Sequence, residues 1–170
     1  MLSSQKSHNA GRRTGGPIQI STGREPINVT DNLAQELDRM ARPVAFAAGV
    51  ELFHCGDPVA AVYTVRRGKV SLVWSAADKP YPIGLLGPGS IIGLPAALNG
   101  TYSVGACAAE DSELGFIPAD RVVEVLQANP RLCLAAMKLV GQELARLRST
   151  IMHIAETRAW EQAEEKPERS

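Results

Sequence analysis

The sequence predicts a mainly β protein with flanking helices, namely an antiparallel β jelly roll with one helix before it and a long helix after it. Between Pro43 and Pro118, short β-prone runs alternate with glycine-containing turns, which is typical of sandwiches and barrels. Helical periodicity occurs on both sides of this region. The chain has 170 residues, 45% of them hydrophobic, which fits one packed domain with tails.

Changes in composition along the chain predict its organisation. Residues 1–29 are rich in small and basic residues with few large apolar side chains, so we expect a flexible N-terminal arm. Residues 30–128 are expected to form the β-roll and its flanking helices, and residues 130–158 the long C-terminal helix. Residues 159–170 are predicted to be a polar tail.

The first helix is predicted to have its N-cap at Thr30 and to end by about Ala41. Leu33 and Leu37 recur at helical spacing, and Pro43 disfavours helix in the residue before it. Seven strands should follow, one of which places Val62 and Tyr63 on opposite faces because side chains alternate along a strand. The predicted strands are Val50–Cys55, Ala61–Arg66, Lys69–Ser75, Tyr81–Leu86, Ser90–Ile92, Ser103–Ala109 and Glu113–Ile117.

Helices are predicted at three places after the first strands. Leu94–Leu98 should form one helical turn at the mouth of the sheet. Pro118 suits the first turn of a helix that ends before Asn129, and the long helix starts at Pro130 or Arg131. Five residues of the long helix recur at heptad-like spacing, which predicts a homodimer through this helix: Val140, Leu144, Leu147, Ile151 and Ile154.

The alternative for this apolar stripe is packing on the chain's own barrel. We expect Leu147 to Ile154 to lie beyond the barrel's reach, which favours a partner helix there. For the first half of the helix, near Leu132, Leu134 and Leu139, packing on the barrel is favoured.

Charge and composition disfavour several classes of protein. Lys plus Arg and Asp plus Glu both number 18, whereas a nucleic-acid surface needs excess cations. No apolar run approaches the roughly 20 residues that span a bilayer, and the N-terminus lacks the apolar core of a secretory signal. The sequence therefore predicts a cytoplasmic protein without membrane contact. The three cysteines, Cys55, Cys107 and Cys133, are expected to be buried thiols.

The order of these segments resembles the cyclic-nucleotide-binding domain family, as found in the effector halves of Crp/Fnr-type regulators. FAAGVELFHCGDPVAAVYTVRRGKVSLV is similar to the opening of that domain, LLGPGSIIGLPAAL to its ligand cassette, and AEDSELGFIPADRVVEVLQANPRL to its exit into the C-terminal helices. The resemblance covers roughly residues 42–150. It implies a jelly-roll domain that senses a ligand. The matching positions in the opening are Gly49, Leu52, Phe53, Gly56, Asp57, Tyr63, Val65, Gly68 and Val70.

The resemblance also implies a cassette in which backbone N–H groups hold the cyclic phosphate, an Arg pairs with it and a Glu accepts the ribose hydroxyl. Here Leu94 occupies the Glu position, Tyr102 or Ser103 falls at the Arg position, and residues 80–120 contain no Arg or Lys. A hydrogen bond to a charged group contributes roughly 1.5–3 kcal/mol, so we do not expect cyclic AMP to bind in the usual mode. The candidate pocket residues are Ile92, Gly93, Leu94, Pro95, Ala96, Ala97, Thr101, Tyr102 and Ser103.

The leading hypothesis is a regulatory module that senses a cyclic nucleotide or another small effector and signals through a dimerising helix. The alternative is a protein-interaction scaffold of the same fold that has lost its ligand. Crp/Fnr regulators carry a helix-turn-helix domain after the long helix, and we expect no room for one after Ser149. Direct DNA binding is therefore not expected, and a third possibility is a regulator assisted by a DNA-binding partner protein.

No catalytic, metal or bound-cofactor residues are predicted. Nucleophilic catalysis needs a nucleophile beside a base and an orienting group, and no segment offers that set. His54 and Cys55 are adjacent on a predicted strand, so their side chains should point to opposite faces and cannot chelate a metal or haem by themselves.

Overall fold

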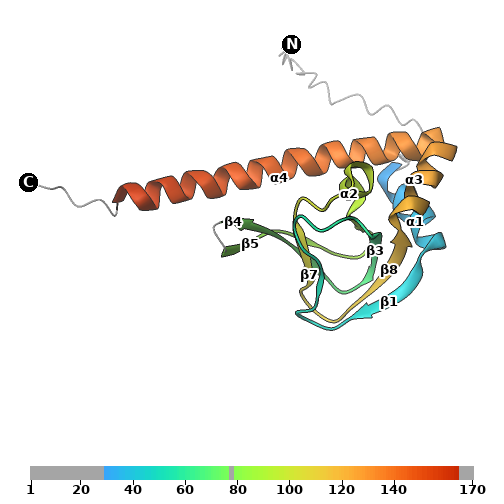
Figure 1. Cartoon of the computed structure of the whole chain (residues 1–170), viewed down its shortest axis with the longest axis horizontal. Coiled ribbons are helices and arrows are strands. Elements are labelled where there is room, and N and C mark those ends of the chain that lie inside the picture. The colour runs from blue at the N-terminus through green and yellow to red at the C-terminus, as the bar shows by residue number, and fades with distance from the viewer. Residues whose placement is uncertain (1–28, 77–78, 165–170) are drawn as a thin grey trace, which may run out of the picture.

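Two four-stranded antiparallel sheets face each other in the computed structural model, which describes residues 29–76 and 79–164 (Figure 1). The first sheet has the order β1 (Arg42–Phe46), β8 (Ser112–Pro118), β3 (Ala61–Arg67) and β6 (Ile91–Ile92). The second has the order β2 (Glu51–Phe53), β7 (Gly105–Ala108), β4 (Val70–Ala76) and β5 (Lys79–Leu86). The predicted jelly roll is confirmed.

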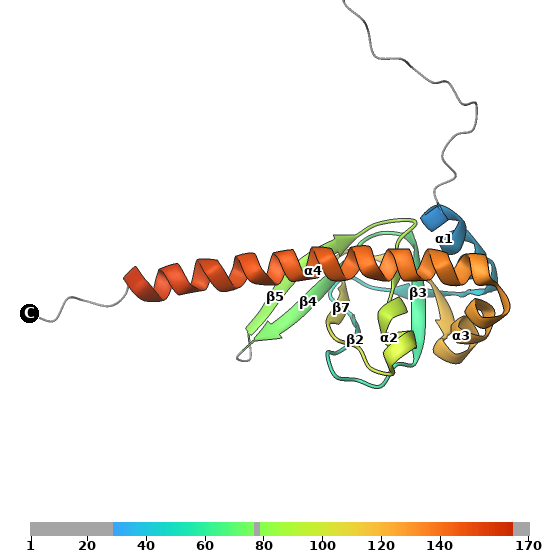
Figure 2. The same cartoon turned by 90° about the horizontal axis from the view of Figure 1, so that it is seen from above.

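Four helices accompany the sheets among the described residues: α1 (Val29–Met40), α2 (Leu94–Asn99), α3 (Ala119–Ala128) and α4 (Pro130–Glu164). The short helix α2 lies at the mouth of the sandwich, where a single helical turn was predicted. Helices α1 and α3 pack at one end, and α4 crosses the sandwich and extends beyond the β4–β5 hairpin (Figures 1 and 2). No helix in the described part of the chain is long and apolar enough to cross a membrane.

The observed elements differ from the predicted ones mainly at the two ends. Strand β1 was not predicted, and it pairs with β8 from Arg42↔Phe116 to Phe46↔Ser112. Helix α1 begins at Val29, just before the predicted cap, and α4 continues to Glu164, past the predicted boundary at 158. The predicted arm, apart from residue 29, lies outside the described residues.

Two apolar clusters share strand β3. One fills the space between the sheets and includes Tyr63 and Val65, and the other lies under α1, α3 and α4 and includes Val62. The alternation predicted for this strand is therefore confirmed. All residues from Ala61 to Val65 are at most 7% exposed, so β3 is the strand that joins the core between the sheets to the core under the helices.

A polar network fastens α1 to the outer face of β3. Arg66 Nε donates to Asp38 Oδ1 at 2.8 Å, and the Thr64 hydroxyl donates to the same oxygen. Arg66 Nη2 also donates to the carbonyls of Asp38 and Ala41. Burial alone raises the pKa of Asp38, but the hydrogen bonds from Arg66 and Thr64 outweigh it and hold that pKa below its ordinary value.

Replacing Asp38 by Asn is expected to lower the free energy of unfolding by about 1–2 kcal/mol at pH 7, as measured by urea denaturation. The figure is modest because the Asp38 side chain is 37% exposed. A carboxyl whose pKa is lowered on folding stabilises the fold above its unfolded pKa and loses that effect as pH falls through the folded pKa. The difference between wild type and variant should therefore shrink below pH 3.8, the ordinary value.

The matched control is Glu36→Gln, which removes an exposed ion pair with Arg39 on the same helix. Exposed ion pairs contribute little to stability, so the control should change the free energy of unfolding by less than about 0.5 kcal/mol both at pH 7 and at acidic pH. A pH-independent deficit in Asp38→Asn would contradict the role assigned to the carboxylate.

Candidate functional site

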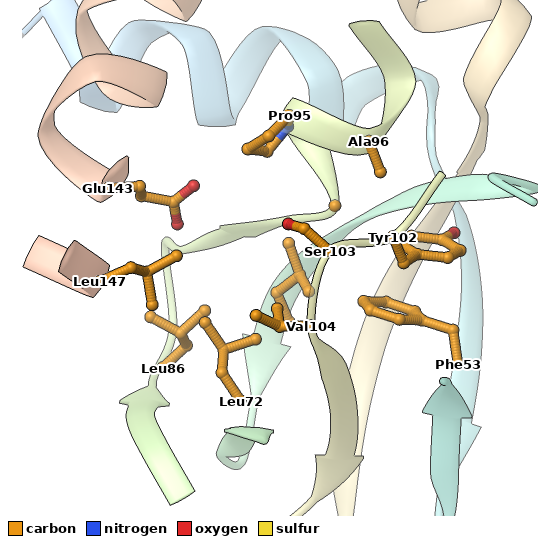
Figure 3. Close-up of a pocket in the computed structure, with 12 residues that line it drawn as sticks. Phe53, Leu72, Leu86, Pro95, Ala96, Tyr102, Ser103, Val104, Glu143 and Leu147 are labelled. Carbon is orange, nitrogen blue, oxygen red and sulfur yellow. The ribbon is translucent and has the colours of Figure 1, made fainter. Parts of the chain in front are cut away.

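A small cavity lies where the mouth of the sandwich meets α2 and α4 (Figure 3). It has a volume of about 40 Å³ and is partly open. One buried water needs roughly 10–15 Å³, so the cavity has room for about three waters. Its lining residues are Phe53, Leu72, Leu86, Ile92, Gly93, Pro95, Ala96, Tyr102, Ser103, Val104, Glu143 and Leu147.

Gly93 makes the turn from β6 into α2 at the edge of this cavity. Its φ is +83°, a conformation that L side chains rarely adopt. A Cβ at this position would lie 3.1 Å from Tyr102 Cε1 and 3.2 Å from the Ala61 carbonyl oxygen. The turn directs the next residue, Leu94, away from the cavity into the cluster beneath the helices, where it is fully buried.

Tyr102 fills the space beside Gly93. Its ring stacks on Phe53 with centroids 3.6 Å apart and planes 8° from parallel. Its hydroxyl donates to the Ala61 carbonyl at 2.6 Å and accepts from the Ala61 N–H at 3.2 Å. The ring is 4% exposed, so Tyr102 is a neutral side chain tied to the barrel wall.

The structure brings six of the nine candidate pocket residues to the cavity and leaves three outside it. Those at the cavity are Ile92, Gly93, Pro95, Ala96, Tyr102 and Ser103. Leu94 and Ala97 pack instead into the helix-side cluster, and Thr101 is exposed beside Pro58.

Sequence reasoning missed the six other lining residues, which come from β2, β4, β5, α4 and the residue just before β7. Glu143 is the single charged residue among the twelve that line the cavity. Burial raises the pKa of its carboxyl above the ordinary value, and Arg146 opposes that shift. A signal for Glu143 was present, because it interrupts the row Ala136, Val140, Leu147 at helical spacing.

Helix α4 has two apolar faces. On the face toward the sandwich, Leu147 and Ile154 pack against the cluster between the sheets and Val140 against the helix-side cluster. The expectation that Leu147 to Ile154 lie beyond the barrel's reach is therefore wrong, because the β4–β5 hairpin extends beneath α4 (Figure 2). On the outer face, four large apolar side chains are more than half exposed, namely Leu134, Met137, Leu144 and Met152. The expectation that Leu134 packs on the barrel is therefore wrong.

The pair His54 and Cys55 lies on the surface between β2 and β3. His54 Nε2 is 2.6 Å from Glu51 Oε2, and this contact, followed by Asp57, raises the pKa of the imidazole. The thiol of Cys55 donates to the Ser103 carbonyl and is exposed, so the expectation of a buried thiol is wrong for this cysteine. Cys107 and Cys133 are half-buried. Among residues 29–76 and 79–164, no group of three or more His, Cys, Asp or Glu is placed to hold a metal ion.

Comparison with known proteins gives a match to one family model and a set of solved structures with a similar fold. The family model described as the cyclic nucleotide-binding domain matches residues 43–129. The transcriptional activator protein anr of Pseudomonas aeruginosa is 30% identical over 122 residues, which cover 70% of this chain and 50% of anr. The chain thus spans about half the length of that relative.

Solved structures show the same fold at lower identity. The catabolite activator protein of Thermus thermophilus superposes with a TM-score of 0.62 at 23% identity, over 79% of this chain and 62% of that one. The c-di-GMP responsive global regulator CLP of Xanthomonas campestris gives a TM-score of 0.62 at 19% identity, over 81% of this chain and 74% of its own. At these identities the similarity establishes the jelly roll with its long C-terminal helix.

Proposed function

Because the chain belongs to the cyclic nucleotide-binding domain family, we propose that it is a ligand-sensing regulatory module in which the state of the small cavity is transmitted through α4. The observation that carries this proposal is that Glu143 and Leu147 of α4 form one wall of the cavity. A ligand that prefers one position of α4 shifts the population toward it. The outer face of the same helix then presents a changed surface to a partner.

We propose that this partner is a second copy of the chain. Eight large apolar residues are exposed in the described part of the chain, and half of them lie in one stripe on α4: Leu134, Met137, Leu144 and Met152. Gly141 lies within this stripe, and a Cβ there would meet nothing within 4 Å, so a second helix can approach closely. Two-fold pairing of one stripe with itself is the commonest form of homodimer.

This outer stripe replaces most of the seam predicted from the sequence. Of the five predicted residues, Leu144 belongs to the outer stripe, Val140, Leu147 and Ile154 pack on the chain's own clusters, and Ile151 is half-buried. The proposed dimer therefore uses the same helix but a face turned away from the barrel.

We propose that cyclic nucleotides do not bind in the mode usual for the family. Tyr102 occupies the cassette, Leu94 is turned into the other cluster, and the one charged group at the cavity is the carboxylate of Glu143, which repels a phosphate. In calorimetric titrations, cyclic AMP, cyclic GMP and cyclic di-GMP should bind no more tightly than about 1 mM. Cyclic di-GMP is included because the regulator CLP responds to it. Micromolar affinity for any of the three would contradict this part of the proposal.

The second candidate function is a ligand-free scaffold of the same fold. The observation that favours it is the stacked, doubly hydrogen-bonded Tyr102, which leaves little empty space. The two candidates differ in one measurable respect, since a sensor must have a small molecule that changes the affinity of the chain for its partner, and a scaffold has none.

The matched relative anr is a transcriptional activator by name, and CLP, which has a similar fold, is called a global regulator linked to virulence gene expression. We propose a regulatory rather than catalytic role here. Because the chain spans half of anr, transcriptional activation is carried over only as a proposal. In that proposal the described residues do not contact DNA bases, the module acts in the cytoplasm, and a partner protein supplies the DNA contact.

A further inference from the structure

Glu143 lies on the face of α4 that is otherwise apolar and packed on the domain. Its side chain points from the helix toward the cavity, next to Leu147 and opposite Ser103 (Figure 3). Within the described residues, no side chain donates a hydrogen bond to its carboxylate. Arg146, on the same helix, acts on it electrostatically without forming an ion pair. A partly desolvated carboxylate without a donor is a site where a ligand's donor gains a strong interaction.

The remainder of the cavity wall is apolar apart from the Ser103 hydroxyl and the tyrosine hydroxyl already bonded to Ala61. Leucine, valine and aromatic side chains form most of the surface: Phe53, Leu72, Leu86, Val104 and Leu147. A ligand that matches this wall has a compact hydrophobic body with one donor at the end that meets Glu143.

The charge of Glu143 disfavours an anionic ligand inside the cavity itself. Residues 80–120 hold no Arg or Lys, and the lining of the cavity adds none. An anionic group placed here meets a like charge in a region of low dielectric, where repulsion is stronger than in water. The cavity is therefore selective against the cyclic phosphate that other members of the family bind.

A second space adjoins the cavity. A groove of about 380 Å³ between α4 and the loop before β6 shares Leu86 and Glu143 with it and includes Gln142 and Arg146. A ligand whose donor sits on Glu143 can thus be longer than the cavity alone permits, with its far end lying along α4.

We infer that the cavity, together with the groove that adjoins it, binds a small hydrophobic amine, with the ammonium group on Glu143 and the apolar body against the leucine and aromatic wall. This inference rests on the proposed function, since it names the ligand class of the same site. In this site Glu143 selects the charge of the ligand. Its own charge is opposite in sign to that of the Arg in the family cassette, so it selects a cation.

The test is a chemical-shift titration of the full chain by NMR with three probes that share one branched body: isobutylamine, isobutanol and isobutyrate. Isobutylamine should bind wild type at least about tenfold more tightly than isobutyrate, and the shifts should map to the residues that line the cavity. Glu143→Gln keeps the shape and removes the charge. It should weaken isobutylamine binding by about 10–100-fold and change isobutanol binding by less than about threefold.

The matched control is Glu156→Gln, which removes the same charge from an exposed position of the same helix and should leave all three affinities unchanged. Equal affinity for amine and carboxylate in wild type, an unchanged preference in Glu143→Gln, or no binding of the amine to wild type would each overturn the inference. Thermal melts of both variants would show that the fold is intact.

The proposed function fails in a different way. If isobutylamine binds through Glu143 but leaves the dimer affinity unchanged in sedimentation, the ligand class stands and transmission through α4 is wrong. If the dimer affinity changes with a cyclic nucleotide and no amine binds, transmission stands and the ligand class is wrong.

Discussion

Replacing Leu144 by aspartate is expected to weaken self-association of the chain by at least about 1000-fold in dissociation constant. Leu144 is 56% exposed in the outer stripe of α4, between Met137 and Met152. In a two-fold dimer the change occurs twice. Each copy loses the burial of a leucine, about 1.5–3 kcal/mol, and the two new carboxylates also have to be desolvated close to each other. Sedimentation equilibrium on wild type and variant measures the effect.

The control is Leu98→Asp, which makes the same substitution at an equally accessible leucine of α2, 52% exposed. It should leave the dimer intact. A second comparison is Leu147→Asp, which alters the face of α4 that packs on the sheets and should lower folding stability first. A wild-type chain that stays monomeric at high concentration would refute the dimer, and a strong effect of Leu98→Asp would place the interface elsewhere.

Replacing Tyr102 by alanine is expected to lower the free energy of unfolding by about 3–5 kcal/mol, because it removes a buried ring and leaves a cavity. The loss is large against a total stability of roughly 5–15 kcal/mol. Replacing Tyr102 by phenylalanine keeps the ring on Phe53 and removes only the two hydrogen bonds to Ala61. That change should cost about 1–3 kcal/mol, since the Ala61 groups remain buried. Urea denaturation at neutral pH measures both.

Thr101→Ala, at the exposed neighbouring position, should change stability by less than about 0.5 kcal/mol. Equal losses for the alanine and phenylalanine variants would mean that the ring contributes nothing beyond its hydroxyl, contrary to the stacking on Phe53. The alanine variant also enlarges the cavity, so it provides a chain in which the space for a ligand is no longer limited by this side chain.

The local signals in the sequence predicted most of the fold. Glycine turns separated the strands, alternation set the two faces of β3, and the short apolar piece after Gly93 became α2. Strand β1 was missed because Pro43 argues against a strand and because the sequence RPVAF does not alternate between apolar and polar residues. Its position depends on pairing with β8, which is distant from it in the sequence, so the neighbouring residues alone do not reveal the strand.

The sequence predicted only the part of the site that lies in one continuous segment of the chain. The cassette residues Gly93, Tyr102 and Ser103 do line the cavity, but the opposite wall comes from β2, β4, β5 and α4, which the topology brings together. Spacing along α4 likewise could not separate its two apolar faces, since Leu144 and Leu147 fall in one heptad pattern yet point to different surroundings. The two faces of α4 can be told apart only in the structure, which shows which of them the β4–β5 hairpin covers.

The pairing of the first strand with the last also governs how the chain can assemble. The β4–β5 hairpin closes locally, with Ala76 opposite Lys79, whereas Arg42 of β1 faces Phe116 of β8 and Glu51 of β2 faces Cys107 of β7. Contacts between residues so far apart in sequence slow folding, because the loop must be closed before the contact stabilises it. During synthesis, β1 and β2 therefore stay without partners until β7 and β8 have emerged. The hairpin is the first part of the sandwich that can exist, and the sheet that carries β1 is the last to be completed.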